Sequence, residues 1–513
     1  MIKTIQIQVN PECAEKKNLL IKKISDDLNI LKTEIKDINI LKKSIDARQK
    51  HIKINLKIDI YINEQYIEKE EKTKYKNVSK AKEVIVIGAG PAGLFAALKL
   101  IEKGLKPIII ERGKKVRNRR RDLAKITKEH IVNSDSNYCF GEGGAGTFSD
   151  GKLYTRSKKR GDVNNILDIL VEHGATKQIR IDAHPHIGTN KLPKIIENIR
   201  DTIINYGGEI HFNSRVSDIK IKDNKVNAIV LKDSTIINCT KIILATGHSA
   251  RDIFYMLQDK GITIEAKSFA LGVRVEHSQE LIDQIQYKCA ARGEYLPPAP
   301  YSIARQINGR GVYSFCMCPG GIIAPCATSQ DEVVTNGWSP SKRDFPTSNS
   351  GIVVGLNLED FKDYKQYGPL AGLEFQKKIE NNAWKMGGQT QKVPAQRLVD
   401  FVNGKISKNV PKTSYIPGVE SANLKELLPE FILKNIQKGF LEFGKHMKGF
   451  FTNEAVVHAP ESRTSSPVRI PRDPMTLEHV QVKGLYPCGE GAGYAGGIIS
   501  AAIDGQKCAS MCS

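Results

Sequence analysis

The glycine sequence at residues 88–93, Gly-Ala-Gly-Pro-Ala-Gly, constrains the fold more than any other feature of the chain. It follows the apolar run VIVI and opens an apolar segment, and a second apolar run ends in Glu111, 23 residues after Gly88. In a strand–turn–helix–strand unit these glycines permit a tight turn, close approach of a diphosphate, and close packing of helix on strand. The helix N-terminus also favours the diphosphate charge. We therefore expect a dinucleotide along Gly88, Gly90, Pro91, Ala92 and Gly93.

The acidic residue that ends the second strand has a separate expected role. Glu111 can accept hydrogen bonds from the ribose hydroxyls of the adenosine, and Arg112 beside it is assigned to the same site. Four further arginines follow, at positions 117, 119, 120 and 121. They either reach the cofactor phosphates or form a solvated run of charge.

The C-terminal segment indicates which dinucleotide is bound. Gly489-Glu490-Gly491 follows the strand pattern GLYPC and precedes a helix that begins near residues 496–498. This arrangement resembles the second FAD signature of the glutathione-reductase-like flavoproteins, in which an acidic residue holds the ribityl or pyrophosphate part of FAD. Here that acid is Glu490, where those families usually have Asp. The sequence ILATG (243–247) resembles their mid-chain motif, so three matches in the proper order favour FAD over NAD.

A second G-x-G-x-x-G sequence, at residues 491–496, does not indicate another nucleotide domain. Only 17 residues follow Gly496, which is too few for a helix, a strand and a ribose-binding acid. We expect no NAD(P) domain. Electrons would then be exchanged with docked NAD(P)H, with an electron-transfer partner protein or with a second substrate.

Six longer segments narrow the resemblance. They are EGGAGTFSDGKL (142–153), FALGVRVEH (269–277), FCMCPGG (315–321), VVTNGWS (333–339), PAQRL (394–398) and ESRTSSPVRIPRD (461–473). Together they resemble the family of uncharacterised bacterial FAD-dependent dehydrogenases, over nearly the whole chain.

This resemblance implies further cofactor contacts. Gly144, Gly146 and Thr147 are expected along the flavin or the pyrophosphate. The backbone of Val216 is expected to meet the adenine, and the helix starting near Gly497 is expected to direct its N-terminus at the flavin pyrimidine. The remaining residues assigned to the cofactor are Ala245, Thr246, Gly247, Gly489, Glu490 and Ile498.

The same patterns divide the chain into three parts and predict an α/β protein. Residues 1–80 indicate a small α+β, ferredoxin-like domain, because residues 51–62 alternate like a strand with one buried face. Residues 81–267 and 456–513 are expected to form the Rossmann-type FAD-binding domain. Residues 268–455 would be an inserted α+β substrate domain, with a pocket where the insertion meets the flavin.

Charge and cysteine content indicate the setting in which the chain works. Lys and Arg number 77 against 56 Asp and Glu, but lysines occur along the whole chain, so a nucleic-acid partner is not favoured. The 10 cysteines form no regular framework, which favours a reducing cytoplasm. No apolar run approaches the roughly 20 residues of a membrane span, and the first residues lack the apolar core of a secretory signal. We expect a cytoplasmic protein without a membrane partner.

Three residues are candidates for chemistry on the substrate. Cys318 could be a redox or nucleophilic thiol if its pKa is lowered, or a small packed residue. Arg463 could clamp a carboxylate or phosphate, or form a structural ion pair with Glu461 or another acid. His458 could donate a proton at neutral pH, or be a hydrogen-bonded structural residue. No metal site is predicted, because the cysteine spacing matches no recognised zinc motif.

The function expected from these features is hydride transfer between FAD and an unidentified small-molecule substrate. Two alternatives stay open. One is a flavin-dependent RNA-modifying enzyme that would use the basic surface to hold phosphate. The other is a flavin-bound sensor or scaffold without turnover.

Overall fold

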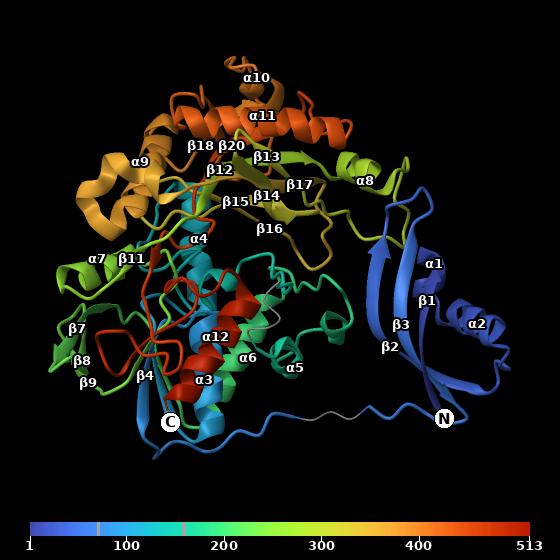
Figure 1. The fold of residues 1–513 in the computed structure, drawn as a ribbon, viewed down its shortest axis with the longest axis horizontal. Helices are drawn as coiled ribbons and strands as arrows, with labels where there is room; N and C mark the ends of the chain where they lie inside the picture. The colour runs from blue at the N-terminus through green and yellow to red at the C-terminus, as the bar shows by residue number, and fades with distance from the viewer. Residues whose placement is uncertain (69–71, 156–160, 513) are drawn as a thin grey trace.

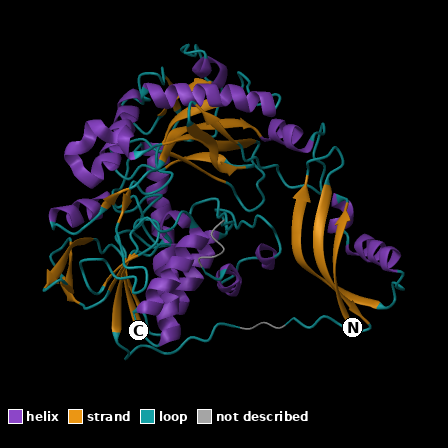
Figure 2. Ribbon diagram, viewed as in Figure 1, coloured by secondary structure: helices purple, strands orange, loops and turns teal. Residues whose placement is uncertain are grey.

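The computed structural model describes residues 1–68, 72–155 and 161–512, and it contains three units (Figure 1). A central unit is built on a parallel sheet, a second unit on a larger and mostly antiparallel sheet, and a small N-terminal unit stands beside them (Figure 2). Residues 69–71 of the expected polar linker lie outside the described residues. Within the described part of the chain, no helix is both long and apolar enough to cross a bilayer.

The central unit contains a five-stranded parallel sheet in the order β22-β10-β4-β5-β6. Alternate residues of β4 enter separate hydrophobic clusters, Val84 and Val86 on one side and Ile85 and Ile87 on the other. Because both faces are covered, these strands are uninterrupted apolar runs. The strands are β4 (Glu83–Ile87), β5 (Lys106–Ile110), β6 (Glu209–His211), β10 (Ile242–Leu244) and β22 (Leu485–Pro487). The helices are α3 (Pro91–Lys103), α4 (Val116–Glu129), α5 (Val163–Glu172), α6 (Leu192–Asn205), α7 (Arg251–Asp259) and α12 (Ile498–Met511).

A small antiparallel sheet packs with α7 on one face of the parallel sheet. It comprises β7 (Val216–Lys222), β8 (Lys225–Leu231) and β9 (Ile236–Asn238). Asp223 and Asn224 join the first two strands with φ angles of 52° and 56°, as a type I′ hairpin turn requires. β7 and β8 thus form a two-stranded antiparallel hairpin.

The second unit is a seven-stranded sheet in the order β13-β14-β17-β12-β20-β18-β19, with α11 packed on one face (Figure 1). The strands are β12 (Ala270–Ser278), β13 (Ala304–Ile307), β14 (Arg310–Cys318), β17 (Thr347–Gly355), β18 (Val393–Arg397), β19 (Val419–Ser421) and β20 (Val456–Glu461). The helices are α8 (Gln279–Tyr287), α9 (Ala371–Met386), α10 (Leu398–Val402) and α11 (Glu430–His446). The remaining elements are β11 (Glu265–Ala266), β15 (Ile322–Pro325), β16 (Thr335–Trp338), β21 (Val468–Arg469), and the 3₁₀ helices η1 (Gly144–Gly146), η3 (Lys177–Arg180) and η4 (Leu358–Leu370).

One predicted boundary needs correction. We assigned the segment from residue 456 onward to the FAD-binding domain, but β20 hydrogen-bonds to β12 and β18. It therefore belongs to the seven-stranded sheet. The chain returns to the central unit only after this strand.

The N-terminal unit is a three-stranded sheet in the order β1-β3-β2, covered by two helices. Its elements are β1 (Ile2–Val9), α1 (Pro11–Glu15), α2 (Lys17–Leu28), β2 (Ile35–Asp46) and β3 (Lys53–Ile62). Ile54, Leu56, Ile58 and Ile60 are buried on one face of β3, as the alternation predicts. A ferredoxin-like arrangement would need a fourth strand, and the described residues of this sheet contain three. The backbone of Lys43 in β2 also pairs with residues 181–183 of the central unit.

Close packing of α12 on α3 joins the last helix of the chain to the first helix of the central unit (Figure 1). A Cβ atom placed on Gly505 of α12 would lie 2.1 Å from the backbone oxygen of Ala92. Backbone cannot move away as a flexible side chain can. We therefore expect Gly505→Ala to lower the free energy of unfolding by about 3 kcal/mol, measured by thermal or urea unfolding.

Gly355→Ala is the matched control, because the nearest atom to its added Cβ is 3.9 Å away, an ordinary contact. Its stability should stay close to that of the wild type. Equal effects of the two substitutions would contradict the importance of the α3–α12 contact.

Candidate functional site

A cavity of about 380 Å³ opens where the carboxyl ends of β4, β5 and β10 face the second unit. This edge of a parallel α/β sheet is where ligands bind. Most residues that the sequence assigns to the cofactor line the cavity: Gly88, Gly90, Pro91, Ala92, Glu111, Arg112, Gly144, Gly146, Val216, Ala245, Thr246, Gly247, Glu490, Gly497 and Ile498. The wall also contains residues of β14, β16 and β20, so the cavity extends from the central unit to the seven-stranded sheet.

Glycine turns from distant parts of the sequence meet at the floor of this cavity. A Cβ on Gly88 would lie 2.5 Å from the backbone oxygen of Ala245, and a Cβ on Gly491 would lie 2.5 Å from the backbone oxygen of Gly247. Gly88 also has a φ of 102°, which side chains rarely tolerate. The three strand ends can approach this closely only because these positions lack side chains.

Two helices begin at the cavity. The N-caps of α3 and α12 are Gly90 and Gly497, and neither cap offers a side chain to the free N–H groups of the first turn. A Cβ on Gly146 would lie 3.1 Å from Pro91 and 3.7 Å from Ile498, the first residues of the two helices. The site thus combines two uncapped N-termini, which favour negative charge.

Glu111 holds the cavity wall together. Its carboxylate accepts backbone N–H groups from Ala89 at 2.8 Å and from Gly113 and Gly141, both at 2.9 Å. A carboxylate has about four acceptor directions, so one direction is left for a ribose hydroxyl. Glu111 therefore links the glycine turn to the loop that leads into η1, in addition to its predicted role.

Three residues that we assigned to the cofactor lie behind the wall and do not line the cavity. A Cβ on Gly93 would lie 1.9 Å from the backbone oxygen of Gly88, so its role is the packing of α3 on the turn. The Thr147 hydroxyl donates to the Glu142 backbone oxygen at 2.6 Å. The Gly489 N–H donates to Asp504 at 2.7 Å. The last two contacts position loops that carry lining residues.

The arginines after Glu111 have structural or solvent-facing roles. Arg119 is buried and donates to the backbone oxygens of residues 137, 138, 142 and 144 at 2.7–2.9 Å. It thereby fixes the loop that carries Gly144. Arg117, Arg120 and Arg121 are exposed, which is the solvated alternative. Arg112 lines the cavity and stacks its guanidinium over the Phe140 ring at 4.5 Å.

Arg463 lines the cavity, but its guanidinium is held by protein carboxylates. It pairs with Glu332 at 2.6 Å and with Glu380 at 2.9 Å. Arg251 pairs with the same two acids at 3.3 and 2.8 Å. The predicted structural ion pair therefore exists, with partners other than Glu461, and two positive charges balance two negative ones. Arg463 has little capacity left to clamp a substrate.

Cys318 and His458 do not reach the cavity. Both are fully buried, and burial raises the pKa of the Cys318 thiol. Burial also lowers the pKa of His458 to about 4, despite a hydrogen bond to the Arg274 backbone oxygen. At neutral pH the thiol is protonated and the imidazole is uncharged. The packing role of Cys318 and the structural role of His458 thus replace the catalytic roles that we considered.

Cys316 takes the position that we expected for Cys318. The pairing of β14 with β17 shifts between Phe315 and Cys318, and Cys316 has a φ of 45°. Such bulges redirect side chains near functional sites, and Cys316 opens into the cavity. Loss of solvation inside the protein raises the pKa of the Cys316 thiol to about 11. The thiol is therefore protonated at neutral pH. This favours a neutral wall residue over a nucleophile.

Lys152 and Asn336 also line the cavity, and sequence reasoning did not select them. Both lie within segments that carried the family resemblance, EGGAGTFSDGKL and VVTNGWS. A single lysine or amide has no characteristic spacing that distinguishes it from surface residues.

Three segments of the chain match known protein families. Residues 268–464 match a family described as FAD-dependent protein, C-terminal domain-like, residues 83–120 match an FAD-binding domain, and residues 1–61 match a domain of unknown function. An uncharacterised protein of Clostridium beijerinckii is 42% identical over 512 residues, which cover 96% of this chain and 95% of that protein. The chain belongs to one family with this Clostridium protein, and it contains domains that match FAD-dependent proteins.

More distant similarities were also found. A thiamine thiazole synthase of Methanococcus vannielii is 22% identical over 204 residues, which cover 38% of this chain and 63% of that protein. The crystal structure of a geranylgeranyl bacteriochlorophyll reductase-like protein of Thermoplasma acidophilum has 12% identity and a TM-score of 0.35, and the match covers 84% of this chain and 78% of that one. The C-terminal family match also ends beyond β20, in agreement with the placement of this strand in the second sheet.

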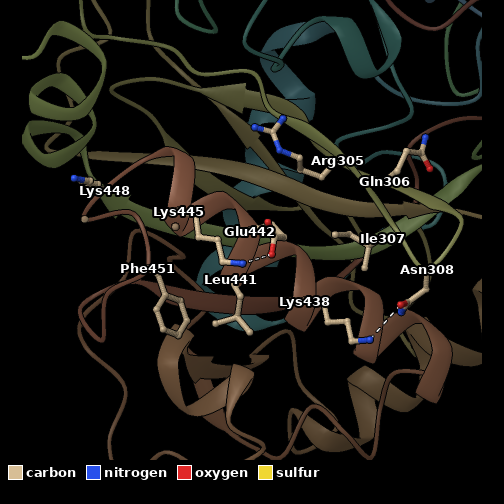
Figure 3. Close-up of a pocket in the computed structure, with 12 residues that line it drawn as sticks. Arg305, Gln306, Ile307, Asn308, Lys438, Leu441, Glu442, Lys445, Lys448 and Phe451 are labelled. Atoms are coloured by element: carbon tan, nitrogen blue, oxygen red, sulfur yellow. Dashed lines mark hydrogen bonds and ion pairs between the residues drawn. The ribbon is translucent and has the colours of Figure 1, made fainter.

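A second depression lies apart from the residues that we assigned to the cofactor. It is a groove of about 790 Å³ between β13 and α11 (Figure 3). Arg305, Lys438, Lys445 and Lys448 line it, and its acid, Glu442, pairs with Lys445 at 2.6 Å. The groove shares no residue with the cavity at the glycine turns, and none of the predicted site residues lines it.

One buried cluster has the residue types of a metal site. Ligand atoms of Cys488, Asp504 and Cys508 lie within 4.8 Å of one another. However, Arg472 pairs with Asp504 at 2.6 Å and donates to the Cys508 sulfur at 3.3 Å. The guanidinium thus already supplies the positive charge that a metal ion would bring.

The buried ion pairs that Arg463 and Arg251 form with Glu332 predict that the stability of the fold depends on pH. Burial alone would raise the pKa of Glu332, but Arg463 and Arg251 outweigh it and lower the pKa to about 2. Because this lies below the unfolded value near 4.5, Glu332 stabilises the fold fully above about pH 4.5 and loses this contribution as the pH falls toward 2. The stability advantage of the wild type over Glu332→Gln should shrink by about 1 kcal/mol between neutral pH and about pH 3.5.

Urea unfolding of both proteins at the two pH values measures this difference. Glu420→Gln serves as the control, because Glu420 pairs with Lys392 on the exposed surface. Its difference from the wild type should stay nearly constant. A constant difference for Glu332→Gln as well would contradict the lowered pKa.

Proposed function

We propose that this protein is an FAD-dependent oxidoreductase that acts on a small-molecule substrate. One observation supports the proposal above all: a single cavity joins the glycine turns and the two uncapped helix N-termini to the wall of the seven-stranded sheet. The glycine turns and helix N-termini suit a dinucleotide. The wall formed by the seven-stranded sheet offers a position for a substrate at a junction between units.

The residues present fit FAD. Gly247, Gly496 and Gly497 have no atom within 4 Å of an added Cβ, so they leave room along the wall. In this proposal Val216 and Glu111 hold the adenosine, and the first turn of α3 holds the diphosphate. The first turn of α12 lies against the flavin and favours negative charge there. Bound FAD supplies hydride-transfer chemistry, and the protein supplies orientation and charge.

The source of the electrons is also part of the proposal. The described residues contain one five-stranded parallel sheet of the Rossmann type, and this sheet carries the FAD residues. We propose that a docked nicotinamide such as NAD(P)H, a partner protein or a second substrate exchanges electrons with the bound cofactor. The protein itself needs only to leave a path to the cavity for one of them.

Gly497→Leu tests the assignment of the cavity to FAD. Its φ of 162° is extended backbone that any residue adopts, so the new side chain should enter the cavity without clashing with the protein. We expect FAD affinity to fall about tenfold or more, because overfilling a packed site costs roughly 1–3 kcal/mol. Fluorescence titration of flavin-free protein with FAD measures the affinity, and thermal unfolding of the flavin-free protein should be unchanged.

Gly497→Ala is the graded control, with a smaller loss of affinity. Unchanged FAD affinity in Gly497→Leu would argue that the cofactor does not pass the start of α12.

Turnover distinguishes an oxidoreductase from a sensor or scaffold. Protein with bound FAD can be reduced by light in the absence of oxygen and then mixed rapidly with nicotinamides, quinones and small carbonyl compounds. We expect fast reoxidation with at least one class and slow reoxidation with the others. Uniformly slow reoxidation would favour the non-catalytic alternative.

A further inference from the structure

Lys152 is a charged side chain at the end of the cavity that faces the seven-stranded sheet, and the proposed function does not yet use it. Its side chain is 35% exposed, although its segment lies within the protein, because it lines the cavity. Its ammonium lies 3.4 Å from the Cys318 sulfur and 3.5 Å from an oxygen of Asp150. The Lys152 side chain lines the cavity while it makes both contacts.

The backbone around Lys152 is fixed on both sides. The Leu153 N–H donates to the Pro185 oxygen at 2.9 Å, and the Ile187 N–H donates to the Gly151 oxygen at 3.1 Å. Lys152 itself forms a β-bridge with His186. Because the main chain cannot shift, the ammonium is confined to the part of the cavity that its own side chain reaches. A site on such a fixed backbone is preorganised.

The carboxylate beside Lys152 is shared with a second cation. Asp150 is buried, and Lys152 and Arg343 approach the same carboxylate oxygen at 3.5 and 3.6 Å. Neither carboxylate oxygen has a hydrogen-bond partner among the described residues. Two cations thus share one carboxylate. The neighbouring Arg274 does not share the Asp150 carboxylate, because it pairs with Glu461 at 2.8 Å.

The pKa shifts of Lys152, Asp150 and His186 determine which of these groups are charged at neutral pH. Burial would lower the pKa of Lys152, but Asp150, together with Cys318 and Cys316, outweighs burial and holds the pKa above its ordinary value. Burial would raise the pKa of Asp150, but Lys152 and Arg343 hold it below its ordinary value. Burial lowers the pKa of the nearby His186 to about 4, so this imidazole is uncharged at neutral pH. Lys152 is therefore protonated at neutral pH and presents its ammonium to the cavity.

We infer that Lys152 binds a carboxylate group of the substrate, with Asp150 and Arg343 behind it as positioning residues. This inference rests on the proposed function and names the substrate class for the same cavity. The single ammonium of Lys152 matches a monoanion better than a phosphate dianion, which would leave a negative charge uncompensated in a poorly solvated site. A lysine ammonium acts as a compact point charge for such a group. Substrates without an anionic group would lack this anchor.

The experiment uses the FAD-loaded protein and propionate as the probe. We expect calorimetric titration to show saturable binding of propionate, and no binding of propionamide, its neutral isostere. Lys152→Met should weaken propionate binding about tenfold or more, because a hydrogen bond to a charged group is lost. Lys152→Arg keeps the charge and should restore most of the affinity. Lys448→Met, in the groove of Figure 3, should bind propionate like the wild type.

Results that contradict the proposed function can be told apart from results that contradict the carboxylate site. FAD content is read from the visible spectrum before each titration, so protein that retains no flavin would count against the proposed function. Flavin-loaded wild type that does not bind propionate would overturn the anion site. Equal binding by Lys152→Met would also overturn it, and tighter binding of inorganic phosphate than of propionate would overturn the choice of a carboxylate.

Discussion

Backbone segments that are distant in the sequence approach one another at the cavity floor so closely that no Cβ atom fits between them. Gly88 meets the backbone of Ala245, and Gly491 meets the backbone of Gly247. These contacts bring the ends of β4, β10 and β22 to one edge of the sheet. They also place the uncapped starts of α3 and α12 at one cavity. The cavity that we propose for the cofactor therefore depends on missing side chains more than on any particular polar residue.

Polar side chains around the cavity mostly stabilise its walls. Glu111 and Arg119 bind backbone groups of the loop before η1, and Arg463 belongs to a balanced cluster with Glu332 and Glu380. Such satisfied buried groups hold loops in fixed positions. Because their charges and hydrogen bonds are already committed, the ammonium of Lys152, which lines the cavity, stands out as the contact that we propose for a substrate.

The sequence predicted the central unit well and the second unit poorly, for a physical reason. The strands around Gly88 are apolar on both faces, and the turn residues have specific conformations, so periodicity and glycine spacing identify them. β12 and β17 are also buried, but they carry Arg274, Glu276 and Asn349, whose side chains form hydrogen bonds inside the protein. β2 was missed because two bulges interrupt its alternation. Likewise, whether an arginine or cysteine reaches the cavity depends on partners distant in sequence, as Arg463 and Cys316 illustrate.

Flavin content of the purified wild-type protein tests the central claim most directly. The account predicts that the protein is yellow, or becomes yellow on incubation with FAD, and that titration saturates at one FAD per chain. The adenosine and flavin ends should then both be shielded from solvent, because both glycine turns contact a single cofactor. A protein that stays colourless after incubation with excess FAD and gel filtration would contradict the account.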